Sequence, residues 1–135
     1  MRTFLNTFTA LLILTTFTFA GQRIVNPAET NKNLVKALNH HNHGVVESAI
    51  RVVILMKIQY SDADYDNIID QLDELVVKGA NKNIRLKALI ASDYLRNFEQ
   101  YGWLKDKDYS KGDEVFDAYL SKMSLKGIAN SENKI

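Results

Sequence analysis

Three histidines, His40, His41 and His43, form the clearest candidate for metal binding in this chain. Imidazole nitrogens bind zinc and copper, and either metal usually takes a third or fourth ligand. Glu47 follows His43 by about one helical turn, so its carboxylate is available as that ligand. The alternative is a polar helix end, where histidines complement the helix dipole. The sequence leaves both interpretations open.

A second candidate is a calcium loop, because Asp62, Asp64 and Asp66 alternate like the first ligands of such a loop. Asp73 falls at the twelfth position counted from Asp62. A calcium loop has glycine at its sixth position and a bidentate glutamate at its twelfth, whereas this chain has Asn67 and an aspartate. The helix dipole alone favours acidic residues in a first turn. We therefore interpret this segment as the start of a helix.

A third candidate is the aromatic group of Tyr101, Trp103 and Tyr109, which lies beside the alternating lysines and aspartates of residues 105–108. Tryptophan and tyrosine dominate the energetics of interfaces, so an exposed cluster would bind a peptide or a sugar. The other interpretation, which we favour, is a lid that folds back over the core of the last helical hairpin.

The chain lacks the residue patterns of common enzymes. It has no cysteine, its six glycines are scattered singly, and its histidine cluster has no serine at a recognisable spacing. We therefore predict no catalysis and no cofactor.

The first 20 residues have the features of a secretory signal peptide. Arg2 supplies a positive charge, residues 8–19 are apolar apart from threonines, and Thr18 and Ala20 are the small residues that precede a cleavage site. The apolar stretch is shorter than the ~20 residues that span a bilayer. We predict cleavage after Ala20, export to the periplasm or the extracellular space, and no membrane attachment afterwards. Residues 21–26 would form a linker.

The charge balance of the exported chain points away from nucleic acids and anionic membranes. Without Arg2, the 17 Lys and Arg residues become 16, which equals the 16 Asp and Glu residues. Both of those partners require clustered basic residues, and none occur here. We therefore predict that neither nucleic acids nor anionic membranes are partners.

Apolar residues at helical spacing predict five helices. Asn26 and Pro27 favour the start of the first helix, and residues 61–64 have the capping-box pattern of the third. Asn81 is expected to cap a fourth helix that runs to about residue 100. The β-branched residues of the second helix also fit a buried strand over residues 51–58, but its length favours a helix.

The apolar stripes recur at a nearly constant spacing. Leu34 and Leu72 occupy equivalent positions 38 residues apart, and Ala49 and Ala88 are 39 apart. Phe116 continues the first-helix pattern 44 residues after Leu72. This spacing predicts two helical hairpins and a half, a number at which the end helices need covering by the last helix or by a second copy of the chain.

The segment from Ile84 to Leu89 has the aliphatic-Arg-x-x-Ala pattern that opens the second helix of HEAT repeats. Residues 27–124 thus resemble HEAT or armadillo-like repeats, although Val46 replaces the arginine in the first unit. The resemblance implies an all-α fold, a short right-handed α-solenoid, that binds other proteins without a cofactor. Residues 125–135 would be a flexible tail. The surface implied for binding comprises four polar residues of the second helices: Glu47, Arg51, Arg85 and Arg96.

Overall fold

The computed structural model describes residues 26–105, 109 and 113–132, except for the side chains of residues 125–132. The predicted signal peptide and most of the predicted linker lie outside these residues. The described part contains helices and no strand, so the all-α prediction is confirmed. The elements are α1 (Pro27–Leu38), α2 (His43–Gln59), α3 (Asp66–Lys78), α4 (Lys82–Arg96), the 3-10 helix η1 (Phe98–Leu104) and α5 (Glu114–Glu132).

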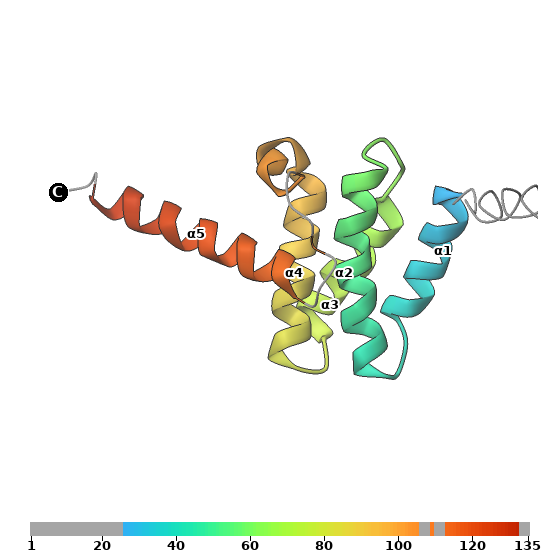
Figure 1. The fold of residues 1–135 in the computed structure, drawn as a ribbon. Helices are drawn as coiled ribbons and strands as arrows, with labels where there is room; N and C mark the ends of the chain where they lie inside the picture. The colour runs from blue at the N-terminus through green and yellow to red at the C-terminus, as the bar shows by residue number, and fades with distance from the viewer. Residues whose placement is uncertain (1–25, 106–108, 110–112, 133–135) are drawn as a thin grey trace, which may run out of the picture.

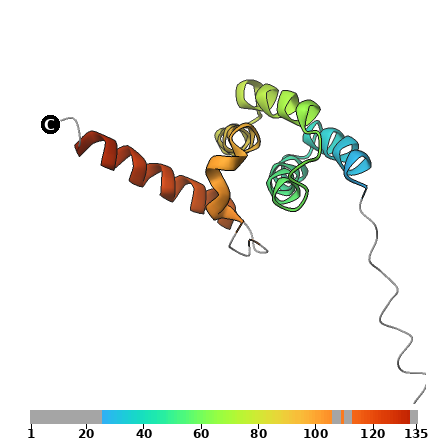
Figure 2. The ribbon, with the colours of Figure 1, turned by 90° about the horizontal axis from the view of Figure 1, so that it is seen from above.

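The first four helices form two hairpins, α1 with α2 and α3 with α4, which pack side by side (Figure 1). In the view from above, α1 and α3 lie on one side and α2 and α4 on the other (Figure 2). Each hairpin therefore contributes one helix to each of two layers. None of the helices in the described residues is long and apolar enough to cross a membrane.

Asparagine side chains begin three of the four helices in these hairpins. Asn26 accepts a hydrogen bond from the backbone N–H of Ala28 at 3.1 Å, and Pro27 follows as the first helical residue. Asn42 caps α2 through Gly44, and Asn81 caps α4 through the N–H of Ile84 at 2.9 Å. Each cap satisfies a backbone donor that has no partner within the helix. The predicted caps at Asn26 and Asn81 are confirmed.

The β-branched segment of residues 51–58 lies inside α2, so the helix prediction is confirmed and the strand alternative is wrong. Ile50, Val53 and Ile54 are almost completely buried between the two layers. Full burial of one aliphatic side chain is worth about 1.5–3 kcal/mol. This packing outweighs the small helix penalty of β-branched residues.

The predicted start of the third helix at residues 61–64 is wrong, because α3 begins at Asp66. Residues 60–65 form a turn instead. The ammonium of Lys57 donates to the carbonyl of Ser61 at 2.5 Å, and the hydroxyl of Tyr65 donates to the carbonyl of Tyr60 at 3.0 Å. These two side-chain bonds hold the turn and compete with the capping-box pattern, so the helix begins later.

The C-terminal part differs most from the sequence expectation. The helix predicted to reach residue 100 ends at Arg96, and η1 follows it. α5 packs against α4 near its start and then projects away from the other helices (Figure 1). Its backbone is helical through Gly127 to Glu132, within the residues 125–135 that were predicted to form a flexible tail. One glycine costs only about 1 kcal/mol within a helix, which is too little to end it.

Candidate functional site

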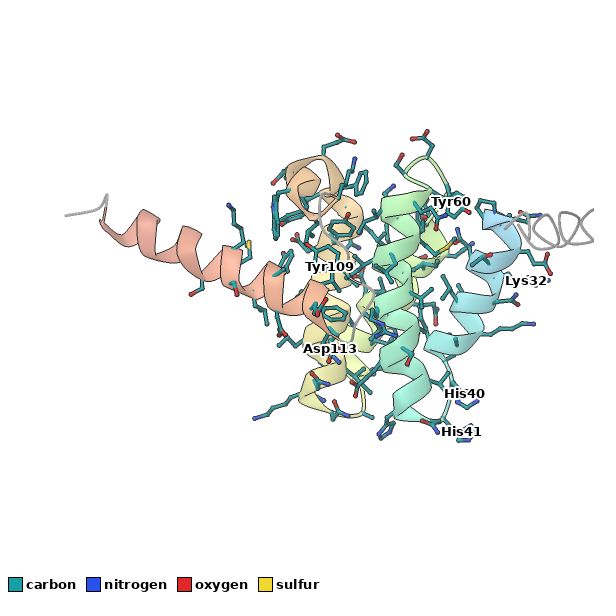
Figure 3. The ribbon with its side chains drawn as sticks, in the orientation of Figure 1. Lys32, His40, His41, Tyr60, Tyr109 and Asp113 are labelled. Atoms are coloured by element: carbon teal, nitrogen blue, oxygen red, sulfur yellow. The ribbon has the colours of Figure 1, made fainter. Side chains whose placement is uncertain are left out.

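The three histidines of the predicted metal site line a common depression of about 290 Å³. His40 and His41 lie in the turn between α1 and α2, and their rings stack with centroids 4.3 Å apart (Figure 3). His40 Nδ1 accepts a hydrogen bond from the N–H of Asn42, while His43 opens α2. Glu47 bonds Lys87 instead of facing the histidines. Within the described residues, no three His, Asp or Glu side chains are arranged to hold a metal ion.

The aspartates of the predicted calcium pattern are dispersed. Asp64 accepts from the N–H of Asp66 at 3.0 Å and so caps the start of α3. Asp73 lies further along α3 and pairs with Arg96 and the hydroxyl of Ser92 on α4. These hydrogen bonds hold the pKa of the Asp73 carboxyl below its usual range. Of the alternating aspartates only Asp66 lies in the first turn of α3, while Asp62 and Asp64 precede the helix.

The aromatic residues after α4 form the lid that we favoured from the sequence. Tyr101 and Tyr109 are buried, and Trp103 packs against the core. Tyr94 of α4 contacts the Tyr101 ring at 5.8 Å between centroids. These three aromatic side chains therefore pack into the core at this end of the molecule and do not form an exposed binding cluster.

The residues predicted to bind protein lie among polar groups of their own chain. Glu47 accepts hydrogen bonds from Asn83 and Lys87. Arg85 donates to the carbonyl of Gly79 at 2.7 Å and thereby satisfies the C-terminal end of α3. Arg96 pairs with Asp73, and Arg51 lines a small cavity beside Lys87. Their role in partner binding stays a prediction.

Lys87 forms a buried ionic cluster that the sequence did not reveal. Its side chain is only 7% exposed, and its ammonium lies 2.8 Å from Glu47 and 2.7 Å from Asp113. Burial lowers the pKa of Lys87, but the hydrogen bonds and charges of the two carboxylates outweigh it and raise the pKa overall. The cluster joins α2 and α4 to the residue that precedes α5 (Figure 3).

Asp93 forms a second polar cluster at the base of α5. Its carboxylate accepts hydrogen bonds from the hydroxyls of Tyr101 and Tyr119 and from the side chain of Asn97. Burial raises the pKa of Asp93, but these three donors outweigh it and hold the pKa below its usual range. Burial and the same carboxylate raise the pKa of Tyr119. The cluster therefore joins α4, η1 and α5 by satisfied hydrogen bonds.

A groove lies between α1 and α3. Its central part encloses about 590 Å³, and it continues into a depression of about 560 Å³ beside the start of α1. Asn31 and Asp64 line both parts. We call this feature the α1–α3 groove. The residues that line its central part include Lys32, Val35, Lys36, Asn67, Ile68 and Asp70.

The charged side chains of the α1–α3 groove, unlike those near α5, form no ion pairs with one another among the described residues. Lys32 and Lys36 are exposed on α1, with Asp64 and Asp70 exposed on the opposite side. Among the described residues, no salt bridge crosses the groove between these lysines and aspartates. Oδ1 of Asn31 is shielded from solvent and has no hydrogen-bond partner in that part of the chain. This groove is therefore the surface best equipped to receive a ligand.

The α1–α3 groove was missed because it depends on how the hairpins stack. The sequence did contain a signal for it. Asn31 and Val35 are four residues apart and so lie on one face of their helix, and the same holds for Asn67 and Gln71. Comparisons of the chain with family models, with curated proteins and with solved structures found no match.

Proposed function

We propose that this chain is an exported helical-repeat module that binds another protein and has no catalytic activity. The observation that carries the proposal is the α1–α3 groove, which combines an apolar floor with charged sides that form no ion pair across it. The two polar clusters near α5 bond to their own chain, which is consistent with a structural role for them.

The proposed architecture is a short right-handed α-solenoid of the HEAT or armadillo-like type. Support comes from the packing of α1 against α3 and of α2 against α4, together with the repeat spacing of 38 and 39 residues. In such a stack, adjacent first helices leave a groove along their shared surface. The α1–α3 groove occupies that position here.

Export is part of the same proposal and is supported by the apolar leader that ends at Ala20. N-terminal sequencing of the protein recovered from the native extracellular or periplasmic fraction tests it. We expect the mature chain to begin at Gly21. Recovery of a chain that still begins at Met1 from the cytoplasm would contradict export and leave the groove unaffected.

A homodimer remains the proposed way to cover the exposed apolar side chains at the C-terminal end. Leu86 and Leu89 of α4 and Leu120 and Met123 of α5 are each at least 40% exposed. Sedimentation velocity across a wide concentration range tests this part. A monomer at every concentration would rule out the dimer.

Partner binding is tested by placing a photo-crosslinking amino acid at Asn67, an exposed position in the groove. The matched control carries the same amino acid at Lys82, which is exposed at the start of α4. In the native envelope fraction we expect a discrete adduct from position 67 that unlabelled mature protein competes away, and no such adduct from position 82. Equal yields at both positions, or no adduct at either, would refute the proposal.

A further inference from the structure

The two sides of the α1–α3 groove carry opposite charges. Lys32 and Lys36 lie one helical turn apart on α1, and Lys32 is exposed at the outer side of this helix (Figure 3). Asp64 and Asp70 lie on the other side, at the start of α3 and within it. Because no ion pair joins the two sides in the described residues, a ligand with both charges can satisfy both.

The floor of the groove suits a polypeptide backbone. The half-buried side chain of Val35 provides apolar contact, while the exposed amide of Asn67 offers both a donor and an acceptor. Asn31 donates to the carbonyl of Asp64 and keeps an unpartnered acceptor at the junction of the two depressions.

The length of the groove limits the ligand. α1 has 12 residues, which at a rise of about 1.5 Å each gives roughly 18 Å. An extended chain advances about 3.3 Å per residue, so about five or six residues fit alongside α1. Successive side chains of an extended chain point to opposite sides. Odd-numbered positions would therefore face one side of the groove and even-numbered positions the other.

We propose that the α1–α3 groove binds an extended peptide segment in which acidic and basic residues alternate. The acidic side chains face Lys32 and Lys36, and the basic side chains face Asp64 and Asp70. This inference rests on the proposed function, because it names the partner segment for the same groove. A purely acidic ligand such as a nucleic acid would be repelled by the aspartate side.

Fluorescence anisotropy with labelled peptides tests the pattern. One peptide alternates glutamate and lysine over six residues, and the other has the same composition in two blocks, three glutamates and then three lysines. Exposed ion pairs change affinity about two- to fivefold each, so losing two of them predicts about tenfold weaker binding of the block peptide. Added salt should weaken binding of the alternating peptide.

A double-mutant cycle assigns the charges to their sides. Lys32→Gln with Lys36→Gln should weaken the alternating peptide about tenfold. A second peptide has glutamine in place of each glutamate and cannot form the ion pairs with these lysines. The double variant and the parent protein should bind this second peptide with affinities that differ by less than about twofold. Lys82→Gln, an exposed lysine outside the groove, should change neither peptide. Circular dichroism and thermal melting check that each variant is folded.

Three outcomes would overturn the inference. Equal affinity for the alternating and block peptides would show that the groove does not recognise alternating charges. An equal loss of affinity for the glutamate and glutamine peptides in the cycle would show that the two lysines do not pair with the glutamates. A crosslink from position 67 to a second copy of this chain would show that self-association covers the groove. If the crosslink at position 67 captures a distinct partner while neither peptide binds, the proposed function stands and the ligand class is wrong.

Discussion

The α1–α3 groove and the base of α5 are both rich in charged and polar side chains, but they use them differently. At the base of α5, the charges of Lys87 and Asp93 are largely buried, and each is bonded to groups of its own chain. In the groove, Lys32 and Asp70 are exposed and do not pair across the gap. Polar groups at the base of α5 therefore stabilise the fold, whereas those of the groove remain available to a ligand.

The largest expected difference comes from removing Asp93. Asp93→Ala deprives the buried hydroxyls of Tyr101 and Tyr119 of their shared acceptor. Loss of the partner of a buried polar group costs about 1–3 kcal/mol, so we expect the free energy of unfolding to fall by about 2–3 kcal/mol. Chemical denaturation monitored by circular dichroism measures this change.

The matched control for Asp93→Ala is Asp70→Ala in the groove. Exposed substitutions away from structural contacts usually change stability by less than about 0.5 kcal/mol. Similar losses in both variants would mean that the groove aspartate also stabilises the fold, and the contrast between the two regions would disappear.

A smaller effect is expected from Lys87→Met, which keeps most of the side-chain volume but removes the charge. Two charge-assisted hydrogen bonds are lost, but Asp113 is 53% exposed and can be hydrated. We therefore expect a loss of about 1–2 kcal/mol in denaturant unfolding. Lys32→Met should leave stability within about 0.5 kcal/mol of the parent protein. A neutral Lys87→Met variant would show that the buried ion pairs do not stabilise the base of α5.

Acid should weaken the base of α5 through Asp93. Its pKa in the folded protein lies below the ordinary value, so the folded state favours the ionised carboxylate. That stability is fully present above the unfolded pKa of about 3.9 and is lost as the pH falls below it. The free energy of unfolding of Asp93→Asn should therefore fall less steeply than that of the parent protein between about pH 5 and about pH 3. Parallel pH curves for the two proteins would contradict this assignment.

The smallest effect is expected from zinc. His40 and His41 stack on each other, and no three metal-binding side chains gather in the described residues. A bound ion would raise the melting temperature, because binding adds to the free energy of folding. We expect micromolar zinc to leave the melting temperature unchanged in the parent protein and in His41→Ala. A rise that His41→Ala abolishes would restore the histidine cluster as a metal site.

The sequence was sufficient for features that depend on local pattern. The asparagine caps at positions 26 and 81 and the helical state of residues 51–58 follow from residue types and spacing. The lid formed by Tyr101 and Tyr109 was also anticipated, because large aromatic residues beside a hairpin core tend to bury themselves.

Features that depend on contacts outside the patterns of capping and helical spacing were not predicted. The turn before α3 is held by Lys57 and Tyr65, and local capping rules do not include such bonds. Lys87 lies on an otherwise apolar face of α4, and its two partners are 40 and 26 positions away in the chain. The α1–α3 groove likewise arises only when two hairpins are stacked. The sequence alone therefore does not show that its lysines and aspartates lie on opposite sides of one groove.

The central claim is that ligands bind between α1 and α3 and not on the second helices. The most direct test is to map amide chemical shifts of the isotope-labelled mature protein while the alternating glutamate–lysine peptide is added. We predict that the shifts concentrate at Asn31, Val35 and Asn67. Shifts concentrated around Glu47, Arg85 and Arg96, with α1 and α3 unchanged, would contradict the account.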